Sequence, residues 1–204
     1  MTANLWPAVT AGRRRPAAVR LNRLQTDVSG TSAGSDSRTT PVRSPGLAAW
    51  VRPAHTVAVI RLGTLADLPA ASSVFRRASL SNPGDRDSLL AHPEYLILGP
   101  EGLAEGRTYV AEEDGSVVGF ATWAAAADVT ELEDLFVDPD WRRRGIAAAL
   151  VDRIVDVVRA RGVRCLEVTA NPDAEGFYRA AGFIDCGTAE TDFGPAPRKR
   201  LSFR

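Results

Sequence analysis

The spacing of hydrophobic residues divides the chain after residue 55 into short strands and helices. Alternating apolar and polar residues predict strands over 56–62, 107–114, 116–123, 129–137, 164–170 and 198–203. Apolar residues at helical spacing predict helices over 67–80, 145–161 and 173–181, with a shorter one near 87–91. Gly115 separates two strands as in a hairpin, and Gly162 and Gly182 follow helices as C-terminal caps. This order of elements predicts a mixed sheet with helices on both faces.

Residues 1–55 lack any sustained hydrophobic period. The stretch TDVSGTSAGSDSRTTPVRSPG consists of small, polar and turn-forming residues. Such a composition buries no core, so we expect a disordered basic tail, with eight arginines against Asp27 and Asp36. The tail is interpreted as a dispensable extension, and the open alternatives are a basic arm for nucleic acid and an organelle-targeting peptide.

Composition narrows the class of protein. The chain has 204 residues, enough for one domain with a core. No stretch approaches the roughly 18 apolar residues of a membrane span, and the N-terminus lacks the apolar core of a secretory signal. Cys165 and Cys186 are too few for a disulfide framework, and the two histidines form no metal-binding pattern with them. We therefore expect a cytoplasmic protein with no membrane partner and no metal.

One segment, DPDWRRRGIAAAL (138–150), places three arginines and a glycine directly before an apolar helix. The start of a helix carries unpaired N–H groups and the positive end of the helix dipole, so cations crowded there indicate a bound anion. The N–H groups of residues 143–148 can point into one concavity, and Gly145 lets the backbone approach a ligand closely. The segment predicts a site for a phosphate-bearing ligand. The alternative is a capped amphipathic helix with solvated arginines.

Two motifs resemble those of a known family. RRRGIA (142–147) resembles the R/Q-x-x-G-x-G/A motif of the GNAT superfamily of acyl-CoA N-acyltransferases, with Ala147 where glycine is commoner. NPDAEGFYRAAGF (171–183) is similar to its N-x-x-A-x-x-F-Y-x-x-x-G-F block. The resemblance covers residues 56–204 and implies an α/β (α+β) domain with a mixed, mostly antiparallel central sheet and helices on both faces. It also implies acetyl-CoA as cosubstrate and direct acetyl transfer to a primary amine through a ternary complex.

The resemblance also implies roles for individual residues. Strand LEDLFV is similar to that of the spermidine/spermine acetyltransferases, which implies Glu133 as the base and Asp134 as a ligand of a cationic amine. Glu131 is the alternative base, and Tyr178 is the general acid toward the CoA sulfur. Strict alternation places Glu131 and Glu133 on one face of the strand and Asp134 on the other, unless a bulge intervenes. The implied cofactor-binding residues are Leu135, Phe136, Val137, Arg142, Arg143, Arg144, Gly145, Ile146, Ala147, Ala148, Asn171 and Tyr178.

The charge balance favours one kind of acceptor. Residues 56–204 carry a net charge of −6, which favours a small cationic amine. The alternatives are an acetyltransferase for protein N-termini or lysines and a non-catalytic acyl-CoA-binding module. A pure binding module needs neither a strand carboxylate nor Tyr178. Nucleic-acid binding through the tail is disfavoured by the acidic domain. We expect a monomer or a homodimer.

Overall fold

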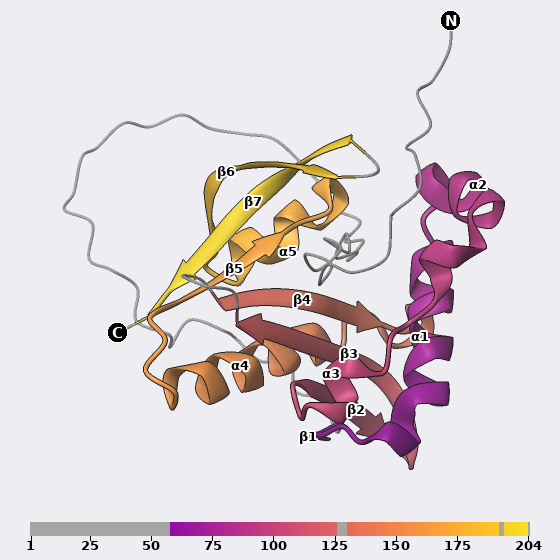
Figure 1. Cartoon of the computed structure of the whole chain (residues 1–204), viewed down its shortest axis with the longest axis horizontal. Helices are drawn as coiled ribbons and strands as arrows, with labels where there is room; N and C mark the ends of the chain where they lie inside the picture. The colour runs from indigo at the N-terminus through magenta and orange to yellow at the C-terminus, as the bar shows by residue number, and fades with distance from the viewer. Residues whose placement is uncertain (1–57, 126–129, 192–193, 204) are drawn as a thin grey trace, which may run out of the picture.

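A computed structural model of the chain describes residues 58–125, 130–191 and 194–203 (Figure 1). The expected disordered tail, residues 1–55, lies outside the described residues. The strands are β1 (Val59–Leu62), β2 (Thr108–Glu113), β3 (Ser116–Ala125), β4 (Thr130–Val137), β5 (Cys165–Thr169), β6 (Ile184–Thr191) and β7 (Gly194–Ser202). The α-helices are α1 (Leu68–Leu80), α2 (Pro83–Ala91), α3 (Glu101–Ala104), α4 (Ile146–Arg159) and α5 (Glu175–Ala180). Short 3-10 helices are η2 (Leu65–Asp67), η3 (Pro93–Leu96), η4 (Pro139–Trp141) and η5 (Pro172–Ala174).

Within the described residues the strands form a seven-stranded sheet in the order β1-β2-β3-β4-β5-β7-β6. Neighbouring strands are antiparallel except β4 and β5, which are parallel. The predicted mixed, mostly antiparallel sheet is therefore confirmed. β4 and β5 pair at two positions only, Thr130 with Leu166 and Glu131 with Glu167. Beyond them the strands diverge (Figure 1). We call this divergence, between residues 132–137 of β4 and residues 168–171 at the end of β5, the fork.

Helices cover both faces of the sheet, as the sequence predicts. The stripe of Ile146, Leu150, Ile154 and Val158 on α4 is buried in the larger apolar cluster, together with side chains of α5. α1 packs on the opposite face in a smaller cluster that includes Val110, Phe120 and Phe136. Within the described residues, no helix is both long and apolar enough to cross a membrane.

The turns follow the glycines of the sequence. Asp114 and Gly115 both have positive φ, 48° and 75°, which is the backbone of a two-residue hairpin loop with the twist that suits paired strands. Gly162 and Gly182 both have φ of 81°, the left-handed conformation in which glycine commonly ends a helix. The hairpin and both helix ends are thus confirmed.

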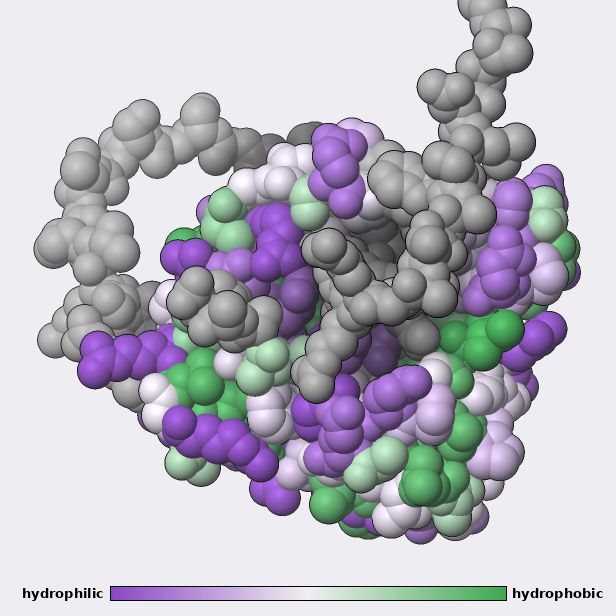
Figure 2. Space-filling model, in the orientation of Figure 1, coloured by the Kyte–Doolittle hydropathy of each residue, from purple (hydrophilic) through white to green (hydrophobic). Residues whose placement is uncertain are grey.

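Four elements differ from the sequence prediction, and one of them is β7, which begins at Gly194 rather than at residue 198. α2 begins at Pro83 rather than near residue 87, because Asn82 accepts a hydrogen bond from the Gly84 N–H and proline suits the first helical position. The helix α3 and the strand β6 are absent from the prediction. β6 is exposed along most of its length, so it lacks the buried alternation of an inner strand. On the face shown in Figure 2, the uncovered surface around β6 and β7 mixes hydrophilic, neutral and hydrophobic residues.

Candidate active site

The fork leaves one edge of β4 open. From residue 132 onward β4 pairs with β3 on one side, and no strand of the described residues pairs with the other side. The side chains of Leu135 and Val137 are buried toward α4, and that of Phe136 is buried toward α1. The Asp138 N–H bonds the Val118 carbonyl of β3, so by strand alternation the backbone groups of Phe136 also face β3. Leu135 and Val137 therefore offer a ligand at the open edge their backbone groups rather than their side chains. An unpaired strand edge accepts an extended chain that carries amide groups.

At the end of β4 the chain turns into α4 through an unusual backbone. Arg143 and Gly145 have positive φ, 61° and 80°, and Gly145 is the residue before the first helical position. Glycine adopts this left-handed conformation without a steric penalty. The backbone conformation is therefore a second reason for a glycine at position 145, besides the close approach of a ligand. Among the described residues, the backbone N–H groups of residues 145–148 meet no hydrogen-bond acceptor. Four such N–H groups at the start of a 14-residue helix suit an anion.

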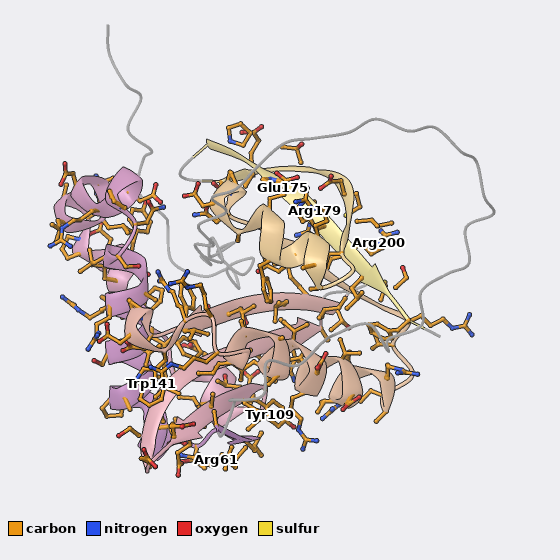
Figure 3. The ribbon with its side chains drawn as sticks, turned by 180° about the vertical axis from the view of Figure 1, so that it is seen from behind. Arg61, Tyr109, Trp141, Glu175, Arg179 and Arg200 are labelled. Atoms are coloured by element: carbon orange, nitrogen blue, oxygen red, sulfur yellow. The ribbon has the colours of Figure 1, made fainter. Side chains whose placement is uncertain are left out.

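The three adjacent arginines have different surroundings. Arg142 is half-buried, and its Nη2 donates to Ser81 Oγ at 2.8 Å. Burial lowers the pKa of this guanidinium. Arg143 is exposed. Arg144 lies 4.4 Å above the ring of Trp141, which Figure 3 labels. The side chain of Arg142 therefore serves α1, whereas the exposed Arg143 stays available to a ligand at the start of α4.

A β-bulge decides which face of β4 carries the carboxylates. Thr122 pairs with Asp134 but Trp123 pairs with Leu132, so Glu133 is an extra residue opposite β3. Glu133 and Asp134 consequently line the same cavity. The prediction from strict alternation, which placed Asp134 on the face opposite Glu133, is wrong because of this bulge.

The cavity beside the bulge is small, and polar and apolar side chains line it together. Its volume is about 50 Å³, enough for one or two water-sized groups. Thr108 and Thr122 are both buried on its wall, and their hydroxyl oxygens lie 2.9 Å apart. A Cβ on Gly102 would lie 2.6 Å from Thr108 Oγ1, so only a glycine lets α3 pack this closely on the threonines. The lining residues are Leu98, Gly99, Glu101, Gly102, Leu103, Arg107, Thr108, Phe120, Thr122, Glu133 and Asp134.

Glu133 has one arginine partner in this cavity. Arg107 Nη1 lies 3.3 Å from Glu133 Oε2 and donates to the Trp123 carbonyl oxygen at 2.6 Å. The same guanidinium lies 2.7 Å from Glu105. Of the three contacts that Arg107 makes, the contact with Glu133 is the longest. It is therefore the easiest of the three to exchange for a contact with a substrate.

The alternative base, Glu131, is held more firmly. Arg198 of β7 donates to Glu131, and also to Glu167 at 2.7 Å and to Thr169 at 2.8 Å. Arg200 adds a second contact to Glu167. This network ties β4 to β5 and β7 at the closed end of the fork. A carboxylate with such partners is placed to hold the strands together rather than to take a proton.

On the other side of the fork, α5 carries Tyr178. Its side chain is fully buried, with the rings of Phe177 and Phe183 at 5.2 Å. Burial raises the pKa of its hydroxyl. The hydroxyl has no hydrogen-bond partner among the described residues. A buried polar group of this kind is rare in folded proteins and marks a place where a ligand can supply the missing partner.

Asn171 lies just before η5. Its side-chain oxygen accepts a hydrogen bond from the Asp173 N–H at 2.8 Å, which caps this short helix. The side chain is buried. Its observed contact is thus structural, and any contact with the pantetheine arm of CoA remains a prediction.

Four residues near the carboxylates are missed by the sequence argument: Arg107, Thr108, Thr122 and Arg198. None belongs to a motif. The signal that points toward the arginines is chemical, because half-buried carboxylates on a central strand need cationic partners. The threonines are ordinary strand formers, and only the pairing of β2, β3 and β4 shows that they lie in one row with Asp134.

Comparison with known proteins identifies the family. Residues 75–183, more than half of the chain, match the model of the Acetyltransferase (GNAT) family. The chain belongs to this family, and the resemblance seen in its motifs is confirmed.

Similar curated proteins share part of the sequence. An uncharacterized N-acetyltransferase of Methanocaldococcus jannaschii is 34% identical over 85 residues, covering 37% of this chain and 38% of that protein. The [Ribosomal protein bS18]-alanine N-acetyltransferase of Escherichia coli strain K12 is 35% identical over 74 residues, covering 35% and 50%. Streptothricin acetyltransferase of Streptomyces lavendulae is 40% identical over 90 residues, covering 41% and 48%. The chain therefore spans half or less of the length of these relatives.

Solved structures share the fold at lower identity. The PaiA N-acetyltransferase of Thermoplasma acidophilum in complex with coenzyme A has a TM-score of 0.57 and 17% identity, over 72% of this chain and 99% of that one. The ribosomal-protein-S18-alanine N-acetyltransferase of Escherichia coli has a TM-score of 0.53 and 24% identity, over 72% and 94%. These likenesses establish the fold.

Proposed function

We propose that the chain transfers an acetyl group from acetyl-CoA to a primary amine of a small cationic molecule, by direct transfer in a ternary complex. The observation that carries this proposal is the open edge of β4 leading to unpaired N–H groups at residues 145–148. Acetyl-CoA has a matching shape, an extended arm with amide groups that ends in a pyrophosphate. The coenzyme A in the T. acidophilum relative supports the same reading.

The residues around the fork fit this ligand. Backbone groups of Leu135 and Val137 would pair with the amides of its arm, with the Val137 N–H as a donor toward the thioester carbonyl. The N–H groups of residues 145–148, with Arg143, would bind the pyrophosphate. Acetyl-CoA supplies the thioester that is transferred. The orphaned Tyr178 hydroxyl, which keeps its proton because its pKa is raised, is suited to donate a hydrogen bond to the sulfur.

The amine must lose a proton before it can attack. We assign this proton to Glu133, because its single arginine contact is 3.3 Å long whereas Glu131 is held by Arg198 in a network. Asp134 lies on the same face and contributes negative charge to the acceptor side. With Glu101 at the rim, three carboxylates face one arginine in this cavity, which favours a cationic acceptor.

A second candidate is acetylation of a protein N-terminus. It is supported by the 35% identity over 74 residues with the bS18-alanine N-acetyltransferase of E. coli. A peptide amine is chemically equivalent at the reacting nitrogen. The two candidates differ in what surrounds that nitrogen, a small polycation or a peptide chain.

The deciding experiment is an acetyl-transfer assay with the whole chain. Acetyl-CoA is offered with a panel of small diamines and aminoglycosides, and in parallel with peptides that have a free N-terminus, and released thiol is measured. Turnover with the small cations supports the proposal, and turnover with peptides alone selects the second candidate. Acetyl-CoA binding without turnover on either panel identifies a non-catalytic module. Tyr178→Phe serves as the matched low-activity control.

A further inference from the structure

We propose that Ser81 and Asn82, at the junction of α1 and α2, form a strap across the open end of the fork, and that this strap sets the width available to the acetyl-CoA arm. These two residues are positioning residues rather than catalytic ones. The inference rests on the proposed function, since it concerns the same cofactor.

On the β4 side, the end of α1 is fastened to the turn that leads into α4. Arg142 Nη2 donates to Ser81 Oγ at 2.8 Å and approaches the Ala78 carbonyl oxygen at 3.4 Å. Arg77 reaches in the opposite direction, to Asp138 at 3.2 Å and to Asp140 at 2.6 Å. Two arginines that cross between the same two segments hold them in one relative position.

The surroundings of Arg142 show that it is an anchor. Its guanidinium is half-buried and bonds to a carbonyl and a hydroxyl, which are both neutral. Taking a cation out of water is costly, and an arginine that only raised the local potential for phosphates would remain solvated. The Ala78 carbonyl belongs to the C-terminal end of α1. This end of the helix dipole is negative, so it is a favourable place for the positive charge of Arg142.

On the β5 side, the next residue makes the matching contact. Asn82 Nδ2 donates to Asp173 Oδ2 at 3.1 Å and to Asp85 Oδ2 in α2 at 2.9 Å. Asp173 belongs to η5, the next element after β5. The Asn82 side-chain oxygen meanwhile caps α2 through the Gly84 N–H at 3.0 Å. Two consecutive residues thus contact the segments that follow the two arms of the fork.

The position of the strap explains its effect. The closed end of the fork is held by the pairing of Thr130 with Leu166 and Glu131 with Glu167. Beyond this pairing no strand hydrogen bonds of the described residues join the arms, so side-chain packing alone leaves their separation at the open end some freedom to change. A contact at the open end removes that freedom before the ligand arrives, and preorganisation of this kind increases affinity. Loss of the contact should therefore weaken cofactor binding more than it lowers the turnover rate of the complex once the cofactor is bound.

The test removes the cross-fork contact without disturbing either helix cap. Asp173→Ala deletes the acceptor and keeps the backbone N–H that Asn171 caps. Asn82→Ser keeps an N-cap oxygen for α2 and deletes the amide donor, together with its bond to Asp85 inside α2, so Asp173→Ala is the more selective variant. Asp87→Ala is the charge-matched control, because Asp87 is exposed on α2 and makes no hydrogen bond or ion pair among the described residues. Coenzyme A binding is measured by calorimetry, with KM for acetyl-CoA and kcat for the whole chain.

We expect Asp173→Ala and Asn82→Ser to raise Kd and KM about three- to tenfold, the range of one hydrogen bond, while kcat changes less than twofold. Asn82→Asp sets two carboxylates face to face, so its loss should be larger and should shrink in high salt. Asp87→Ala should match the wild type. The strap is refuted if the wild type binds coenzyme A and the bridge variants bind within twofold of it, or if Asp87→Ala weakens binding equally. A wild type that binds no coenzyme A instead refutes the proposed function and the strap together.

Discussion

The face of the sheet covered by α4 and the face covered by α1 and α3 are built from different side chains. On the α4 face, Leu135, Val137, Leu150 and Ile154 belong to one continuous apolar cluster. On the other face a small apolar cluster around Phe136 adjoins a buried polar row and a cavity. The two faces share the same strands, so the difference arises from which residues the alternation and the bulge direct to each side.

This difference separates stability from function. Apolar burial is the main favourable contribution to folding, and the α4 face supplies most of it. Buried threonines and carboxylates contribute less, because each loses its hydration and must find a partner. Substitutions on the α4 face should therefore lower the free energy of unfolding, whereas those around the fork should alter binding and turnover in a protein that remains folded.

The largest expected change in stability is on the α4 face. Ile154 is fully buried in the middle of α4. Ile154→Ala should lower the free energy of unfolding by about 3 kcal/mol, through lost burial and the cavity left behind. Urea denaturation measures this loss, and coenzyme A affinity of the folded fraction should stay the same. A loss below about 1 kcal/mol would mean that this face is loosely packed.

On the fork side, Tyr178→Phe should leave stability intact and lower turnover. It removes a buried hydroxyl that has no partner among the described residues, so the melting temperature should be equal or higher. Coenzyme A binding should survive. Turnover should fall by roughly a hundredfold, the scale of one general acid. Turnover within threefold of the wild type would remove Tyr178 from the mechanism.

Substitutions of the two glutamates of β4 should also differ, one in its effect on the rate and the other in its effect on stability. Glu133→Gln should lower the rate about tenfold near pH 6 and recover as the pH approaches 9, because neutral amine then forms in solution. Glu131→Gln should instead cost stability, since it removes the negative charge that pairs with Arg198. Rate profiles between pH 6 and 9 with both variants decide the matter. A flattened profile for Glu131→Gln with an unchanged one for Glu133→Gln would make Glu131 the base.

The smallest effect is expected at a pair distant from the fork. Hydrogen bonds from Arg61 hold the pKa of Asp67 well below its usual value, and Arg61 also bonds Glu112. Asp67→Asn should cost about 1 kcal/mol near neutral pH. A lowered folded pKa stabilises the fold above the unfolded value of about 4, and this contribution is lost as the pH falls through the folded pKa. Denaturation of both proteins between pH 7 and 3 should show their difference shrinking, and a constant difference would contradict the ion pair.

The sequence predicted the parts of the molecule that local chemistry determines. Glycines at 115, 162 and 182 mark the turns because each needs positive φ, and the stripe on α4 is visible as a four-residue period. The bulge at Glu133 was not predictable, since it depends on how β3 pairs with β4. The strand β6 was missed for a related reason: its stability comes from pairing with β7 rather than from an apolar period.

Within the candidate site, the sequence likewise identified the residues of the motifs but not the long-range contacts around them. Gly145 and Tyr178 were singled out from their motifs, and the structure adds φ and burial to each. Arg142 Nη2 contacts Ser81, the residue after α1, which the motif did not predict, and the role of Arg142 at the phosphate stays a prediction. Contacts of this kind join segments that are far apart in the chain, so no local sequence pattern predicts them.

The central claim, that the start of α4 binds the phosphates of acetyl-CoA, is tested most directly by calorimetric titration of coenzyme A into the wild type and Gly145→Glu. Gly145→Ala is the control, because it shares the strain at φ 80° without adding a negative charge. The account predicts saturable binding to the wild type, weakened binding to Gly145→Ala, and no detectable binding to a folded Gly145→Glu. A folded Gly145→Glu that binds coenzyme A as tightly as the wild type would contradict it.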